Sequence, residues 1–148
     1  MLVVIPALNE ASTIGLVIDE IPFAVLTDRG YDVKAVVIDN GSTDGTSDAA
    51  LQRGASVIAE SRRGKGFAVR RAFSELSGDY LFLLDGDATY PAQHIAEMLT
   101  LLENGTDVVL GSRLAGTRAP GSISRFNVLG NRLLTSLASL LFQRRTTD

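Results

Sequence analysis

Five short apolar runs alternate with stretches of helical spacing, and this alternation limits the folds that the chain can adopt. Within each run the apolar residues are consecutive, which is typical of strands buried on both faces of a parallel sheet. Strands that alternate with helices at short intervals predict an α/β fold, in which a mostly parallel sheet is flanked by helices. We expect strands at residues 2–6, 33–38, 54–59, 80–84 and 107–110.

The stretches between these runs carry apolar residues three and four positions apart, which is the spacing of one face of a helix. Residues that cap or stop helices stand near the ends of these stretches. We expect four helices: from a cap at Asn9 or Ser12 to Pro22, from a cap at residues 42–44 to Arg53, from Gly66 to a stop at Gly78, and from Pro91 to Asn104.

Length and composition exclude several classes of protein. The 148 residues and the apolar content of 45% fit one globular domain. A net charge of −3 gives no basis for binding nucleic acid, which requires a basic surface. The chain has no cysteine and one histidine, which excludes disulfides, thiolate metal sites and multi-histidine zinc sites.

Targeting segments and membrane-spanning helices have recognisable patterns of charge and hydropathy. No segment resembles a signal peptide, and no apolar cluster approaches the roughly 20 residues of a membrane-spanning helix. The final residues, 143–148, contain no helix-stop glycine, so we expect the chain to be part of a longer protein that continues beyond Asp148.

The fourth apolar run ends abruptly at Asp85-Gly86-Asp87. Open parallel sheets bind ligands at the carboxyl ends of their strands, so we expect both carboxylates to lie in such a crevice, with Gly86 allowing a sharp turn between them. Two carboxylates about 4 Å apart repel by roughly 4 kcal/mol at an effective dielectric near 20, and a divalent cation would remove that cost. Oxygen ligands suit Mg²⁺, Mn²⁺ or Ca²⁺. An ordinary polar turn after a strand is the alternative interpretation.

Three loops should meet at the same edge of the sheet, namely residues 6–10, 39–46 and 85–89. They offer acidic and amide side chains, and small residues that let a ligand approach the backbone. The basic segment 62–66 precedes a helix and is a candidate anion site. It is not a P-loop, because no Ser or Thr follows Lys65, and no GxGxxG motif follows the first apolar run.

The pattern changes beyond Gly111. Residues 111–122 are basic and rich in turn residues, and a leucine stripe at helical spacing begins after Ser124. We therefore divide the chain into a core at residues 1–122 and an amphipathic helical segment at residues 123–148. The stripe either packs into a protein core or lies on a membrane surface, with its arginines near lipid phosphates.

Five motifs follow one another along residues 2–113: Val3 to Glu10 (VVIPALNE), Val37 to Thr46 (VIDNGSTDGT), Gly64-Lys65-Gly66, Asp85-Gly86-Asp87 and Gly111-Ser112-Arg113. In this order they resemble family 2 glycosyltransferases of the GT-A fold. They are most similar to the dolichyl- or polyprenyl-phosphate mannose or glucose synthases. The resemblance implies a nucleoside diphosphate sugar as donor and Mg²⁺ or Mn²⁺ as cofactor.

The resemblance also implies roles for particular residues. Asp85 and Asp87 would form the DxD motif, with Asp85 towards the ribose or sugar and Asp87 towards the metal. We expect Arg113 and Arg125 to bind the acceptor phosphate through charge-assisted hydrogen bonds, although arginines in a loop can also serve solubility alone. The nucleoside pocket would be lined by Pro6, Leu8, Glu10, Asp39 and Lys65.

Three positions depart from the family pattern. Asn40 stands where the family often has a second aspartate, so only Asp39 is assigned to the pocket. Thr89 stands where the mannose synthases commonly have glutamine, which leaves the identity of the donor sugar open. Leu8 stands where an aromatic residue is common, which weakens a role in stacking on the base.

We expect inverting, metal-dependent transfer of a hexose from a donor of the GDP-mannose or UDP-glucose type to a polyprenyl or dolichyl phosphate, at the cytoplasmic face of a membrane. The metal would act as a Lewis acid on the leaving diphosphate. After Gly111 there is no convincing Glu or Asp candidate for a general base. A phosphate acceptor is already ionised and needs no general base. The alternatives are a phosphoglycerate or glycan hydroxyl as acceptor, a non-catalytic module that binds nucleotide sugars, and a doubly wound signalling or flavin domain.

Overall fold

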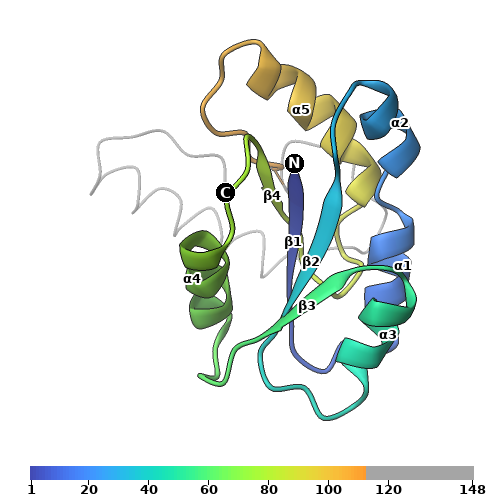
Figure 1. The fold of residues 1–148 in the computed structure, drawn as a ribbon, viewed down its shortest axis with the longest axis vertical. Coiled ribbons are helices and arrows are strands. Elements are labelled where there is room, and N and C mark those ends of the chain that lie inside the picture. The colour runs from blue at the N-terminus through green and yellow to red at the C-terminus, as the bar shows by residue number, and fades with distance from the viewer. Residues whose placement is uncertain (113–148) are drawn as a thin grey trace, which may run out of the picture. The chain divides into compact units, whose positions relative to one another are not determined.

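A four-stranded parallel sheet forms the centre of the protein (Figure 1). The computed structural model describes residues 1–112, of which residues 1–106 form one compact unit. The strand order is β3-β2-β1-β4, which confirms the expected α/β fold. The strands are β1 (Leu2–Ala7), β2 (Lys34–Asp39), β3 (Ser56–Ala59) and β4 (Leu81–Leu83).

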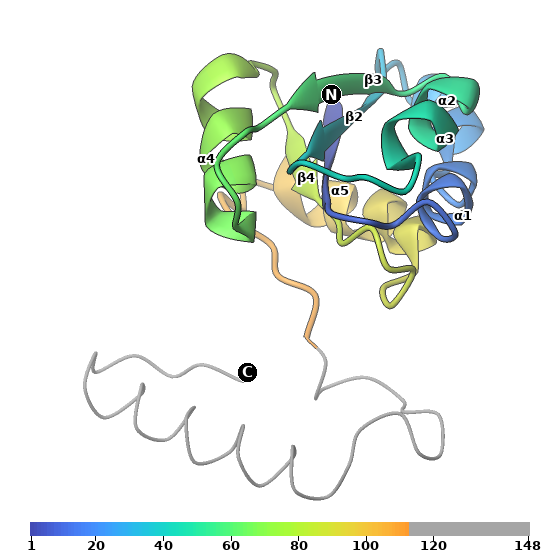
Figure 2. The ribbon, with the colours of Figure 1, turned by 90° about the horizontal axis from the view of Figure 1, so that it is seen from below.

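Helices cover both faces of this sheet, as Figure 2 shows. The helix α4 (Lys65–Glu75) lies alone on one face within the compact unit. The opposite face is covered by α1 (Ile14–Asp19), α2 (Phe23–Asp28), α3 (Thr46–Gln52) and α5 (Ile95–Glu103), with the short 3₁₀ helix η1 (Ala92–His94) ahead of α5.

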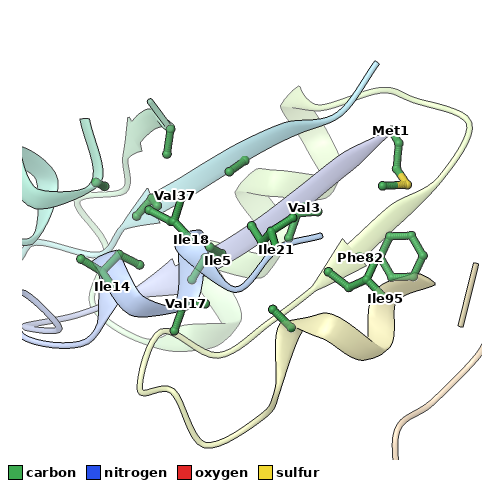
Figure 3. Close-up of a cluster of buried hydrophobic side chains, with 14 of the residues drawn as sticks. Met1, Val3, Ile5, Ile14, Val17, Ile18, Ile21, Val37, Phe82 and Ile95 are labelled. Atoms are coloured by element: carbon green, nitrogen blue, oxygen red, sulfur yellow. The ribbon is translucent and has the colours of Figure 1, made fainter. Parts of the chain in front are cut away.

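The two faces of the sheet explain why the strand sequences are apolar throughout. Successive side chains of a strand point to opposite faces, so Val3 and Ile5 of β1 pack in the larger core on the α1 side (Figure 3). Val4, between them, packs in a second core with Ala68 and Ala72 of α4. Each fully buried valine or isoleucine side chain contributes roughly 1.5–3 kcal/mol, so both cores stabilise the sheet substantially.

The strand order determines where a ligand site can form. From β1 the chain moves outward through β2 to β3, and then returns to the other side of β1 as β4. The order therefore reverses between β1 and β4, and the crevice outside their carboxyl ends is the usual binding site of open α/β sheets. The ends in question are residues 7–10 and 84–87.

The fifth expected strand, at residues 107–110, is wrong. These residues form no strand, and they belong to a second compact unit that begins at Asp107. An apolar run becomes a strand only when a neighbour completes its backbone hydrogen bonds, and no strand among residues 1–112 pairs with this run. The expected helical segment 123–148 lies outside the described residues.

Several helix boundaries also differ from the sequence predictions. Thr13, rather than Asn9 or Ser12, precedes α1, because the Asn9 side chain instead accepts a hydrogen bond from the backbone N–H of Thr43. α1 ends at Asp19, three residues before Pro22, and a further short helix that the pattern did not predict, α2, begins directly after Pro22. Within residues 1–112, no helix has both the length and the hydropathy needed to cross a bilayer.

Candidate functional site

An open pocket of about 200 Å³ lies at the carboxyl edge of the sheet, where β1 and β4 end. All three of the loops that the sequence placed at this edge contribute to it, and so does the start of α4. Six of its lining residues are ones that the sequence analysis had singled out. The lining residues are Pro6, Ala7, Leu8, Glu10, Asn40, Lys65, Ala68, Asp85, Gly86 and Asp87.

Asp85 and Asp87 follow β4 and enter the pocket from its end. The backbone N–H of Leu84 still donates to the carbonyl of Val4 at 3.0 Å, so the ladder with β1 holds the chain up to Asp85. One carboxylate oxygen of Asp87 then accepts the backbone N–H of Thr89 at 2.9 Å. Hydrogen bonds from the Thr89 side chain and backbone, with the nearby charge of Lys65, hold the pKa of Asp87 below its usual value. Asp87 is therefore ionised at neutral pH.

The chain turns at Gly86 and Asp87, as expected, but the positive φ of this motif stands at Ala88, where φ is 57°. Gly86 has no positive φ but is buried against Glu10 and Ala7. A side chain there would bring its Cβ within 3.4 Å of Glu10 Cγ. The glycine therefore serves close packing, which brings the two acidic segments of the pocket together.

Lys65 is the first residue of α4, and its ammonium group forms an ion pair with the carboxylate of Asp85. The pair spans the pocket and joins α4 to the end of β4. The Asp85 side chain is 24% exposed and that of Lys65 is 59% exposed, so solvent reaches both. The pocket thus combines a positively charged side chain with two carboxylates.

Backbone hydrogen bonds to side chains hold Glu10 at the pocket. The N–H of Glu10 donates to Oγ1 of Thr46 at 2.9 Å, and the N–H of Ala11 donates to Oδ2 of Asp44 at 3.0 Å. Thr46 is fully buried and donates its hydroxyl to Asp44 in turn. Segment 39–46, which is rich in Asp and Asn, therefore holds the backbone of the loop that follows β1.

Asp39 is not among the lining residues of the pocket, although it lies at the end of β2 beside the lining residue Asn40. Its carboxylate accepts the backbone N–H of Ser42 at 2.8 Å and the hydroxyl of Ser47. Burial alone would raise the pKa of Asp39, but the hydrogen bonds from Ser47 and Ser42 outweigh it and lower that pKa.

The segment between β3 and α4 carries an ion pair in which the carboxylate of Glu60 is buried and the Arg62 side chain is 55% exposed. Glu60 is only 1% exposed, and its carboxylate accepts two hydrogen bonds from the guanidinium of Arg62, at 2.7 and 2.9 Å. The backbone N–H of Arg62 adds a third at 2.8 Å. Hydrogen bonding from the Arg62 side chain and then its backbone lowers the pKa of Glu60 from 4.5 to about 2. The guanidinium also lies over the ring of Phe67, 4.9 Å from its centroid.

Two further expectations concern metal and acceptor residues. Among the described residues, no group of three or more His, Cys, Asp or Glu side chains is arranged to hold a metal ion, so Asp85 and Asp87 are a pair without a third such ligand. Arg113 and Arg125, the expected acceptor residues, lie outside the described residues. Asn40 is a lining residue that the sequence analysis had set aside.

The chain matches the family model described as glycosyl transferase family 2 over residues 2–145. Glycosyltransferase AglJ of Haloferax volcanii is 43% identical over 130 residues, which cover 87% of this chain and 41% of the relative. A dolichyl-phosphate hexose transferase of the same organism is 35% identical over 147 residues, which cover 99% of this chain and 61% of the relative.

The chain is also similar to solved structures. Glucosyl-3-phosphoglycerate synthase from Mycobacterium tuberculosis, in complex with Mn²⁺, uridine-diphosphate-glucose and phosphoglyceric acid, superposes with a TM-score of 0.60 and 36% identity. The alignment covers 70% of this chain and 39% of that one. The chain therefore spans less than two thirds of the length of each of these three proteins.

Proposed function

The chain belongs to glycosyl transferase family 2, and on that premise we propose that it transfers a hexose, with inversion, from a nucleoside diphosphate sugar to a polyprenyl or dolichyl phosphate. The observation that carries the proposal is the pocket between β1 and β4, which joins the carboxylates of Asp85 and Asp87 to the ammonium of Lys65. Apolar surface, acidic groups and one cation in a single pocket match the parts of a nucleotide sugar.

The donor nucleoside is proposed to bind along the end of β1. Pro6 and the 40% exposed Leu8 offer apolar surface to the base, and Glu10 offers a carboxylate to ribose hydroxyl groups. Asp39, which already accepts two hydrogen bonds, supports the edge of this surface. Lys65 supplies the positive charge for the diphosphate, in a charge-assisted hydrogen bond. Binding of uridine-diphosphate-glucose by the synthase from Mycobacterium tuberculosis supports this class of donor.

The acidic pair fits a divalent cation that is bound together with the donor. Mg²⁺ is usually held by one or two carboxylates plus substrate phosphates, and Mn²⁺ accepts the same oxygen ligands. Asp87, which is ionised, and Asp85 would supply these carboxylates. When bound, the cation neutralises negative charge on the leaving diphosphate. Because Lys65 pairs with Oδ1 of Asp85, its ammonium would compete with a metal for this carboxylate.

A lipid phosphate is proposed as the acceptor because the dolichyl-phosphate hexose transferase matches over almost the whole chain. An ionised phosphate oxygen needs no general base, and Arg113 and Arg125 are proposed to bind it. A lipid acceptor also places the reaction at a membrane surface, which we propose to be the cytoplasmic face. The similarity to the glucosyl-3-phosphoglycerate synthase favours phosphoglycerate as a second candidate acceptor.

The test offers radiolabelled GDP-mannose and UDP-glucose to the protein with Mn²⁺, in the presence of polyprenyl phosphate or phosphoglycerate. We expect label to enter the organic phase with the lipid, and Asp87→Asn to abolish the transfer. Asp28→Asn, at the exposed end of α2, is the matched control and should transfer at the wild-type rate. Label found only in phosphoglycerate would overturn the lipid acceptor, and nucleotide binding without any transfer would indicate a non-catalytic module.

A further inference from the structure

Asn40 lies directly after β2, at the wall of the pocket, and is only 3% exposed. Its backbone N–H donates to the carbonyl of Ala7 at 2.9 Å, which continues the ladder between β1 and β2 by one residue. The residue therefore has a fixed backbone, and its side chain has little freedom. The side-chain amide of Asn40 is therefore held in a fixed position relative to the sheet.

The side-chain amide of Asn40 forms hydrogen bonds with the segment that leads from β3 into α4. Nδ2 donates to the carbonyl of Arg62 at 2.6 Å and to the carbonyl of Glu60 at 3.2 Å. Oδ1 accepts the backbone N–H of Gly64 at 2.6 Å. Both donor hydrogens and the acceptor are thus used, and an aspartate could not reproduce this set because an ionised carboxylate donates no hydrogen bond.

The bond to Gly64 controls where α4 begins. Gly64 has φ 128°, a conformation that side-chain-bearing residues rarely adopt, and its carbonyl accepts the N–H of Phe67 at 2.9 Å in the first turn of the helix. Lys65 follows immediately and reaches across to Asp85. A shift at Gly64 would therefore move Lys65 relative to the carboxylates.

We propose that Asn40 is a positioning residue that holds Lys65 at the diphosphate end of the pocket by fixing Gly64. The inference rests on the proposed function for the role of Lys65, but the tether itself concerns the protein without ligand. Asn40 acts through Lys65, so its removal should affect nucleotide binding only while Lys65 is present.

A double-mutant cycle on nucleotide binding tests this dependence. Calorimetry with UDP or GDP and Mn²⁺ compares the wild type, Asn40→Ala, Lys65→Met and the double variant. Loss of one charge-assisted hydrogen bond predicts that each single variant binds roughly tenfold more weakly, which corresponds to about 1.4 kcal/mol. The double variant should bind no more weakly than Lys65→Met. Two independent sites would instead show additive losses, and that result would overturn the proposal.

A second measurement needs no nucleotide. Acylation of the Lys65 amine, followed by mass spectrometry, reports how well the ion pair with Asp85 protects it. We expect Asn40→Ala to speed acylation of Lys65 towards the rate of Asp85→Asn, in which the partner carboxylate is absent. Asn104→Ala removes an amide that bonds within α5, to the carbonyl of Thr100 at 2.8 Å, and should leave the rate unchanged.

The two measurements separate the failures. If the wild type binds no nucleotide, the proposed function fails, while the acylation rates still decide the tether. Unchanged acylation in Asn40→Ala, with the fold intact by urea denaturation, would overturn the proposal whatever the nucleotide does. Asn40→Ser is a second variant in case Asn40→Ala does not fold, because its hydroxyl adds no charge and can replace one of the lost hydrogen bonds. We expect its acylation rate to lie between those of the wild type and Asn40→Ala, and a wild-type rate in both variants would contradict the tether.

Discussion

The ammonium of Lys65, at the start of α4, forms an ion pair with the carboxylate of Asp85, which follows β4 in the chain. The pair places a positive charge beside the carboxylate that we propose as a ligand of the divalent cation. Under the proposed function, Lys65 would therefore have two opposing effects. It would compete with a metal for Asp85 in the free protein, and it would be available to the diphosphate once a metal had displaced it.

Replacing Lys65 with methionine should separate these effects. We expect Lys65→Met to bind Mn²⁺ several-fold more tightly in the absence of nucleotide, because Asp85 no longer has a competing cation. Electron paramagnetic resonance of free Mn²⁺ measures this directly. Lys34→Met, on an exposed lysine at the start of β2, is the control and should leave Mn²⁺ binding unchanged. Weaker Mn²⁺ binding in Lys65→Met would show that the ion pair supports the metal site rather than competing with it.

Asp87→Asn should remove the dependence of nucleotide binding on metal. In the wild type we expect UDP or GDP to bind more tightly when Mn²⁺ is present, since Asp87 is ionised and contributes a carboxylate oxygen. The variant should bind the nucleotide equally with and without Mn²⁺ in calorimetry. A variant that retains the enhancement would place the metal away from Asp87.

The sequence predicted the sheet and most of the pocket because both depend on local patterns. Continuous apolar runs indicated β1, β2, β3 and β4, and the helices between them indicated that the strands are parallel. The polar residues directly after β1 and β4 then had to meet at one edge. That reasoning correctly brought Glu10, Asp85 and Asp87 together.

The errors concern features that depend on distant partners. The run at 107–110 has the composition of a strand but forms no ladder, and composition contains no information on pairing. Asn40 was left out of the predicted pocket because it departs from the family pattern. Its three side-chain hydrogen bonds reach residues 20 to 24 positions away, which no local pattern reveals. Asn9 was expected to cap a helix, but the same side chain accepts the N–H of Thr43 in another loop.

The Glu60–Arg62 pair predicts a pH dependence of stability. The folded-state pKa of Glu60 is lowered from 4.5 to about 2, so the pair stabilises the fold above pH 4.5 and this contribution is lost as the pH falls towards 2. Urea unfolding at pH 5 and pH 3 should therefore show a smaller loss of stability for Glu60→Gln than for the wild type. The exposed Glu97→Gln should behave as the wild type, and equal losses in all three proteins would contradict the assignment.

The buried Thr46 hydroxyl should matter for stability and for the pocket together. Thr46→Val keeps the shape of the side chain but leaves the N–H of Glu10 without its acceptor and removes the hydroxyl that donates to Asp44. An unsatisfied buried group costs about 1–3 kcal/mol, so we expect a loss of that size in urea unfolding, and weaker nucleotide binding because Glu10 is released. The exposed Thr27→Val is the control. A loss of stability in Thr46→Val no larger than in this control would show that segment 39–46 does not hold the loop after β1.

The central claim is that a nucleoside diphosphate and a divalent cation occupy the pocket between β1 and β4. The most direct test is a crystal structure of the protein with UDP or GDP and Mn²⁺, with anomalous diffraction recorded at the manganese edge. We expect an anomalous peak about 2.0–2.6 Å from a carboxylate oxygen of Asp87 and from the diphosphate, with the base against Pro6 and Leu8. A nucleotide bound elsewhere, or a manganese peak with no contact to Asp85 or Asp87, would contradict it.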